Sequence, residues 1–194
     1  MRVTTHFALW ILGLARAETQ TSDAERDALA SAAASRKRLV EVGVWHGVTT
    51  RRLRQAMATD GVLYAVDPFE AGRLGFSMQW VIAHREVARL GRGQVSWVRL
   101  PSVAAARQVL RNGPVDFVFI DGDHSFEGLA SDWTAWSSGV APDGLIALHD
   151  SVSSRSRDIE GAGSVRYTRD HVRQDRRFEH VGTVDTLTLW RRRA

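Results

Sequence analysis

The strongest constraint on this chain is a series of short apolar runs, each followed by a segment with helical spacing. Continuous apolar strands that alternate with helices are typical of a parallel sheet buried on both faces. The pattern predicts an α/β fold with three layers, a mostly parallel sheet between two layers of helices. The predicted strands are 38–44, 62–67, 94–100, 115–121 and 145–150, and the predicted helices are 48–58, 75–90, 103–112 and 126–140.

The two ends of the chain depart from this alternation. Residues 1–37 are expected to form N-terminal helices that pack on the domain, the first of them amphipathic around the apolar run 7–14. Residues 178–182 and 185–191 read as two strands of an antiparallel hairpin that turns at Thr183-Val184 and closes the sheet. The polar segment 151–163 reads as a mobile loop. We expect one domain overall, with the ligand-binding part at 38–194.

Composition narrows the class of protein. The chain has 194 residues, is 44% hydrophobic and 25% charged, and lacks cysteine, so disulfides and thiolate metal sites are excluded. The net charge of +4 comes mostly from arginines near the C-terminus without interleaved aromatic residues, so no nucleic-acid partner is expected. The apolar run at 7–14 is too short to cross a bilayer. We expect a cytoplasmic protein that does not bind membranes, and a homo-oligomer is possible.

The first strand ends in a glycine turn. Residues 41–50 read E-V-G-V-W-H-G-V-T-T, and this spacing is neither the G-x-G-x-x-G of dinucleotide binders nor a phosphate loop. The second strand ends in Asp67, where an acid can bind both hydroxyls of a ribose. Ligands of open α/β sheets bind at the carboxyl ends of the strands. The two strand ends together predict a nucleoside ligand.

These two stretches resemble motif I and the next acidic motif of class I S-adenosylmethionine-dependent methyltransferases. The stretch FIDGDHSFEGLASDWTAW…VAPDGLIALHD is similar to a subgroup that contains macrolide-sugar O-methyltransferases and cephalosporin-pathway relatives. The resemblance covers about 38–193 and implies a Rossmann-like fold with S-adenosylmethionine as cofactor. Core packing explains Trp45 equally well, and Ser102 reads also as the cap of helix 103–112. The cofactor-binding residues that the resemblance implies are Glu41, Gly43, Trp45, Gly47, Thr49, Asp67, Ser102 and Asp121.

A divalent metal is predicted beside the cofactor. Asp121 and Asp150 end parallel strands and should converge, and a cation would relieve their repulsion while acidifying an acceptor hydroxyl. The resemblance implies Mg²⁺ at these strand ends, but relatives commonly carry Glu or Asn next to Asp150, where His149 stands here. Imidazole suits transition metals better than Mg²⁺. The predicted ligands are Asp121, His149 and Asp150. In one alternative, His149 supports the metal ligands without binding the ion. In the other, no metal binds, and then Asp121 contacts the cofactor while backbone donors hold Asp150.

His124 is the predicted general base. It follows Asp121 by three residues, and in related enzymes this position faces the methyl-acceptor pocket. A histidine there can take the hydroxyl proton, while Asp121 takes part in catalysis as a metal ligand, or the histidine can merely brace the turn. The sequence thus predicts O-methylation of a small-molecule hydroxyl, a sugar or a phenol. The alternatives are a nucleic-acid or protein methyltransferase, and a nucleoside-binding module without catalysis.

Overall fold

The computed structural model describes residues 3–72, 75–89 and 91–194, and in them one sheet forms the middle layer. The strand order is β3-β2-β1-β4-β5-β7-β6. The strands from β3 to β5 pair in parallel, whereas β7 is antiparallel to both β5 and β6. The predicted fold class is confirmed. The strands are β1 Arg38–Val42, β2 Val62–Val66, β3 Gln94–Val98, β4 Val115–Ile120, β5 Val140–Leu148, β6 Phe178–Val184 and β7 Leu187–Arg192.

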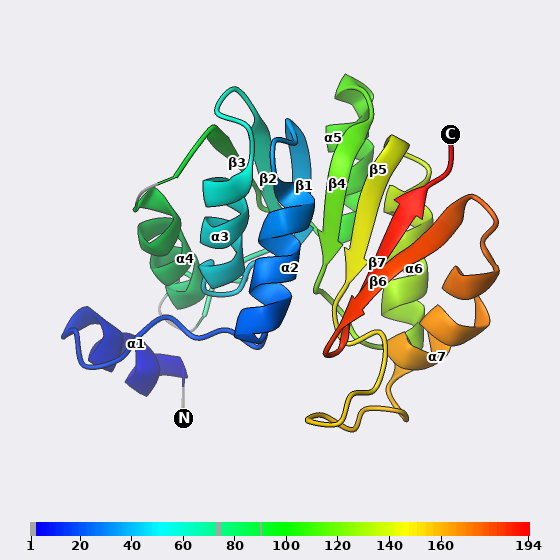
Figure 1. Ribbon diagram of the computed structural model, residues 1–194. Coiled ribbons are helices and arrows are strands. Elements are labelled where there is room, and N and C mark those ends of the chain that lie inside the picture. The colour runs from blue at the N-terminus through cyan, green and yellow to red at the C-terminus, as the bar shows by residue number, and fades with distance from the viewer. Residues whose placement is uncertain (1–2, 73–74, 90) are drawn as a thin grey trace.

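Helices cover both faces of the sheet, as Figure 1 shows. Within one strand, neighbouring residues enter opposite cores: Phe117 and Phe119 pack with α2 and α3, whereas Val118 and Ile120 pack with α5 and α6. This is why the strands read as continuous apolar runs. The helices are α1 Val3–Ile11, α2 Asp23–Ala33, α3 Val48–Ala56, α4 Met78–Ala88, α5 Ser102–Val109, α6 Phe126–Ser137 and α7 Gly163–Asp170, with short 3-10 turns at η1 Leu110–Asn112 and η2 Val172–Gln174.

The C-terminal hairpin is present, but its predicted turn at Thr183-Val184 is wrong. Thr183 pairs with Thr188 and Val184 with Leu187, so β6 continues through Val184 and the chain turns at Asp185. Asp185 takes the left-handed backbone conformation (φ 50°), which Asp tolerates better than the β-branched Val184. The predicted extent of helix 126–140 is also wrong at its end, because Val140 already pairs with Val115 in the sheet.

Two further segments differ from expectation. Helix α7 follows the loop 151–162, although no helix was predicted there. At the N-terminus, α1 begins before the apolar run, and Leu12 and Leu14 lie on the surface, 70% and 73% exposed. The apolar run 7–14 therefore does not form the buried face of a helix. The predicted end of helix 75–90, at residue 90, and the first two residues of the N-terminal helices lie outside the described residues.

No helix among the described residues has the length and apolarity needed to cross a bilayer.

Candidate functional site

The glycine turn brings the end of β1 against the end of β4. Gly43 has φ +86° and donates its N–H to Val66 O at 2.9 Å. A Cβ atom at this position would lie 2.0 Å from the carbonyl oxygen of Asp121. Real Cβ atoms do not approach backbone so closely, so only glycine allows β1 to pass the end of β4 here.

Asp67, at the end of β2, holds this turn closed. Its Oδ2 accepts hydrogen bonds from the backbone N–H groups of Val44 and Trp45, both at 3.1 Å. Its Oδ1 accepts from the N–H of Phe69 at 2.8 Å. A carboxylate has about four acceptor sites. The main role of Asp67 in this structure is therefore to hold the glycine turn, and its carboxylate has little acceptor capacity left for a ribose.

A cavity of about 750 Å³ opens at the carboxyl ends of β1, β2 and β4, beside the glycine turn. Of the predicted cofactor-binding residues, Gly47 is not among the described lining residues. A Cβ on Gly47 would meet Val87 and Ala83 of α4 instead, at 2.9 and 3.1 Å, so Gly47 serves helix packing. The predicted residues that line the cavity are Glu41, Gly43, Trp45, Thr49, Asp67, Ser102, Asp121 and the catalytic candidate His124.

Glu41 lies in the wall of this cavity with an unsatisfied carboxyl group. It is 1% exposed, and neither of its side-chain oxygens has a hydrogen-bond partner in the described part of the chain. Burial, together with the nearby Asp121 and Asp67, raises the pKa of Glu41 well above its usual range. A buried polar group without a partner is costly, so a ligand with a hydrogen-bonding group fits this wall.

The cavity is also lined by a residue that the sequence reasoning missed, Asp132. It lies on α6, is 5% exposed, and burial raises the pKa of its carboxyl group. The helical spacing could have identified it, because Leu129, Trp133 and Trp136 place Asp132 on the buried face of α6. Ser102 lies nearby, and its Oγ accepts a hydrogen bond from Trp136 Nε1 at 2.9 Å. The predicted role of Ser102 as a helix cap is wrong, since Pro101 is the N-cap of α5 and no side chain caps it.

His149 and Glu25 form a buried ion network behind Asp121. His149 Nδ1 lies 2.9 Å from Asp121 Oδ1, and His149 Nε2 lies 3.5 Å from Glu25 Oε2. Burial alone would lower the pKa of His149, but the two carboxylates outweigh it and raise this pKa to about 10. The imidazole of His149 is thus a cation that neutralises Asp121 from inside the protein.

Asp150 is neutralised separately. Its Oδ2 lies 2.8 Å from Arg157 Nη2, a residue of the loop that follows β5, and its Oδ1 accepts from Thr186 Oγ1 at 3.0 Å. Sequence reasoning placed two converging carboxylates here and inferred a metal to relieve their repulsion. In the structure His149 and Arg157 relieve it. Imidazole is a poor ligand for Mg²⁺, so the set Asp121, His149 and Asp150 does not fit that ion. Asp121, His124 and His149 each offer one ligand atom within 4.8 Å of the other two, so a transition metal at these three residues stays a prediction.

His124 lies at the cavity wall with its ring toward these carboxylates. Its Nε2 is 3.6 Å from Asp121 Oδ1 and 4.0 Å from Asp150 Oδ2, and its side chain is 35% exposed. Helix α7 fixes this turn, because Ser164 donates its N–H to His124 O at 2.9 Å. The unpredicted helix α7 therefore positions the predicted base.

The buried carboxylate of Glu25 is expected to stabilise the fold. Its carboxylate accepts hydrogen bonds from Ser22 N, Thr186 N and Thr186 Oγ1 besides pairing with His149, so it joins α2 to the sheet. We expect Glu25→Gln to lower the free energy of unfolding by about 3 kcal/mol, because it leaves a buried cation half paired. Asp27→Asn on the same helix, whose side chain is 71% exposed, should change it by less than about 1 kcal/mol. Urea denaturation measures both, and equal effects would contradict the assignment.

Comparison with known proteins agrees with this geometry. The profile of a family described as a methyltransferase domain matches residues 40–151, more than half of the chain. No curated protein matches. A Corynebacterium glutamicum protein superposes with a TM-score of 0.72 at 14% identity, over 99% of this chain and 89% of that one. An O-methyltransferase from Bacillus cereus in complex with SAH has a TM-score of 0.65 at 17% identity, over 98% and 89%. A cofactor-bound protein from MTB has a TM-score of 0.69 at 16% identity, over 98% and 89%.

Proposed function

The chain belongs to the methyltransferase domain family, and from this premise we propose that it methylates a hydroxyl group of a small molecule. The methyl donor is S-adenosylmethionine, as in members of this class, and the enzyme is an S-adenosylmethionine-dependent methyltransferase. One observation supports the choice of a hydroxyl: the imidazole of His124 and the carboxylate of Asp121 meet at the wall of the cavity that the glycine turn opens.

The cavity, of about 750 Å³, offers polar groups that a bound cofactor could contact. Gly43 lines the cavity, and Glu41 offers a buried carboxyl group without a partner. Asp132 and Ser102 add further polar atoms to the lining. When bound, S-adenosylmethionine supplies an electrophilic methyl group. The residues of the chain hold it in line with the acceptor, and such positioning provides a large part of the rate enhancement.

His124 takes the proton of the acceptor. As the acceptor oxygen bonds to the methyl carbon and the carbon–sulfur bond breaks, the hydroxyl proton passes to an imidazole nitrogen of His124. Asp121, whose Oδ1 lies 3.6 Å from His124 Nε2, stabilises the imidazolium that results. A general base of this kind contributes about 10²–10⁴-fold to the rate. The exposed edge of the ring lets it return the proton to water.

No step of this route needs Mg²⁺, because His149 and Arg157 already neutralise Asp121 and Asp150. We expect enzyme freed of loosely bound ions by gel filtration to turn over at the same rate with and without millimolar Mg²⁺. The measurement is initial-rate methyl transfer to an identified acceptor. A tenfold rise on adding Mg²⁺ would restore the metal-assisted route and end this part of the proposal.

The whole proposal is tested in two stages. Isothermal titration with S-adenosylhomocysteine should give one site per chain, and Asp132→Asn should weaken it, whereas Glu127→Gln, on the same helix, should not. Consumption of S-adenosylmethionine over a panel of sugars and phenols should then identify an acceptor. Failure to bind the cofactor product would reject the proposal, and binding without turnover on any hydroxylated acceptor would favour a catalytically silent module.

A further inference from the structure

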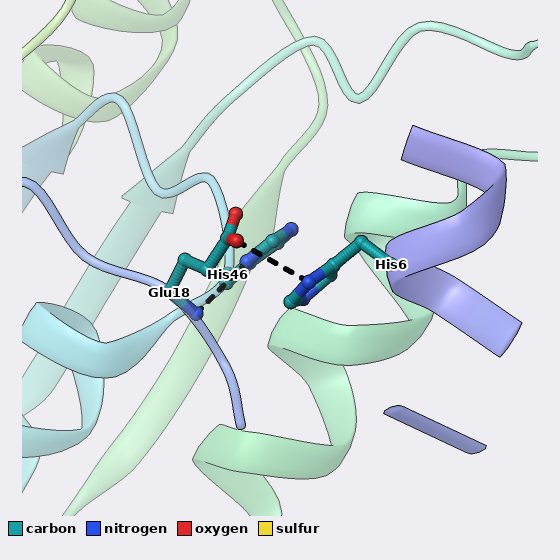
Figure 2. A group of neighbouring side chains, drawn as sticks. All are labelled: His6, Glu18 and His46. Carbon is teal, nitrogen blue, oxygen red and sulfur yellow. Dashed lines mark hydrogen bonds and ion pairs between the residues drawn. The ribbon is translucent and has the colours of Figure 1, made fainter. Parts of the chain in front are cut away.

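Two histidines and a glutamate from distant parts of the chain meet on the outer side of the glycine turn. His6 comes from α1, Glu18 from the segment between α1 and α2, and His46 from the turn between β1 and α3 (Figure 2). His6 Nδ1 lies 3.3 Å from Glu18 Oε1, and Glu18 N donates a hydrogen bond to His46 Nδ1 at 3.1 Å. One ligand atom from each of the three residues lies within 4.8 Å of the other two.

The cluster buries imidazole nitrogens without satisfying them. His6 is 5% exposed and His46 is 3% exposed. Within the described chain, neither ring nitrogen of His6 has a hydrogen-bond partner, although Nδ1 is close to Glu18. Buried polar atoms are normally paired, and an unpaired one calls for a cause such as an ion.

Ring stacking does not supply that cause. The rings of His6 and His46 stack at 5.1 Å with an angle of 6° between their planes, and His46 also stacks on Trp45. Stacking uses the faces of the rings, whereas the unpaired nitrogens of His6 lie at its edge. An apolar residue at position 6 would stack or pack there without a buried donor and acceptor.

The residue that α1 buries most deeply is polar. His6 is the one buried residue of α1, while Val3 and Ile11 are each 57% exposed. The other contacts of α1 are half-buried and aromatic: the ring of Phe7 lies 6.0 Å from that of Phe76, and the guanidinium of Arg85 lies over Trp10. The histidine cluster is therefore the place where α1 is attached to the glycine turn.

We propose that His6, Glu18 and His46 bind a divalent transition metal, with Zn²⁺ as the best match. Two imidazole nitrogens and one carboxylate oxygen form a three-ligand set that zinc accepts, with water in the fourth position. Mg²⁺ prefers oxygen ligands and is a poor match. The rings of His6 and His46 lie face to face in this structure. On metal binding, one of the two imidazoles therefore rotates so that its lone pair points to the ion. The half-exposed side chain of Glu18 is free to follow.

The ion acts as a clip between α1 and the turn that carries Trp45. Both Glu18 and Trp45 line the cavity of the methyl-transfer site, so the clip sets the position of one part of the cavity wall. This inference does not depend on the proposed reaction. The zinc proposal would stand even if the protein methylated a group other than a hydroxyl.

The test uses full-length protein that has been stripped of metal with a chelator and then dialysed. Zn²⁺ is added in a calorimetric titration, and Co²⁺ serves as a coloured probe of ligand geometry. We expect wild type to bind one equivalent at this cluster and to melt several degrees higher when it is filled. His6→Gln and Glu18→Gln should each weaken that equivalent at least 100-fold and remove the rise in melting temperature. His180→Gln, an exposed histidine on β6, is the matched control and should behave as wild type.

Two results would overturn the proposal. In the first, wild type and both cluster variants bind Zn²⁺ with the same stoichiometry and affinity. In the second, the zinc equivalent is retained in His6→Gln and Glu18→Gln but lost in Asp121→Asn, which places it at Asp121, His124 and His149. Should His6→Gln fail to fold, Glu18→Gln carries the test, because its side chain is 46% exposed and its removal leaves the core unchanged.

Discussion

Gly43→Ala should both lower the free energy of unfolding and abolish binding of the cofactor product. The left-handed backbone at φ +86° costs a residue with a Cβ about 1–2 kcal/mol. The added carbon would also lie 2.0 Å from Asp121 O, so the ends of β1 and β4 must separate, at a cost of about 1–3 kcal/mol. We expect the free energy of unfolding to fall by about 3 kcal/mol in urea denaturation. Since Asp121 moves with its carbonyl, S-adenosylhomocysteine binding should be lost in calorimetry.

Gly13→Ala separates the two causes. Gly13 also has a left-handed backbone, at φ +73°, but a Cβ there would have no neighbour within 4 Å. It should therefore show only the backbone cost of about 1 kcal/mol and bind S-adenosylhomocysteine as wild type does. Equal stability of the two variants, with cofactor binding retained in both, would mean that the close approach at Gly43 does not shape the site.

His124→Ala should lower kcat by about 10²–10⁴-fold while the affinity for S-adenosylhomocysteine stays within about threefold. In the proposed reaction His124 would take the acceptor proton and would not hold the cofactor. Steady-state rates with an identified acceptor measure kcat, and calorimetry measures the affinity. Added imidazole should restore part of the rate, because the ring of His124 is 35% exposed and the cavity reaches it.

The imidazole rescue distinguishes a base from a brace. If His124 only supports the turn before α6, its loss would disturb cofactor binding and imidazole would restore nothing. The dependence of log kcat on pH gives a second readout, since the rise with pH that a base produces should vanish in the variant. A variant that keeps wild-type kcat would remove His124 from the mechanism.

The sequence carried enough information for the sheet and for most of the cavity. The strands that end at Asp121 and Asp67 are apolar on both faces, and such strands identify themselves locally. Glycines with positive φ followed by a helix are also a local signal, which is why Gly43 could be predicted to lie at the cavity. Gly47 also has a positive φ and precedes a helix, but a side chain is excluded there by α4. This contact joins segments far apart in the chain, so the spacing of residues does not reveal it.

The electrostatics of the site could not be predicted. His149 pairs with Asp121, which comes from a different strand end, and with Glu25, which lies more than one hundred positions earlier in the chain. Arg157 lies in a loop whose composition says nothing about where it folds back. The sequence predicted a metal from two converging carboxylates, but it did not reveal that His149 and Arg157 would lie beside them. The cluster of His6, Glu18 and His46 was missed for the same reason, since three segments must fold before it exists.

The central claim is tested most directly by following a labelled methyl group. The purified protein would be incubated with S-adenosylmethionine carrying a ¹³C-methyl group and with the acceptor found in the panel, and the product examined by NMR. The account predicts a methyl ether, with the labelled carbon bonded to oxygen, formed at a rate that falls at least 100-fold in His124→Ala. A label on nitrogen or carbon, or an unchanged rate in the variant, would contradict it.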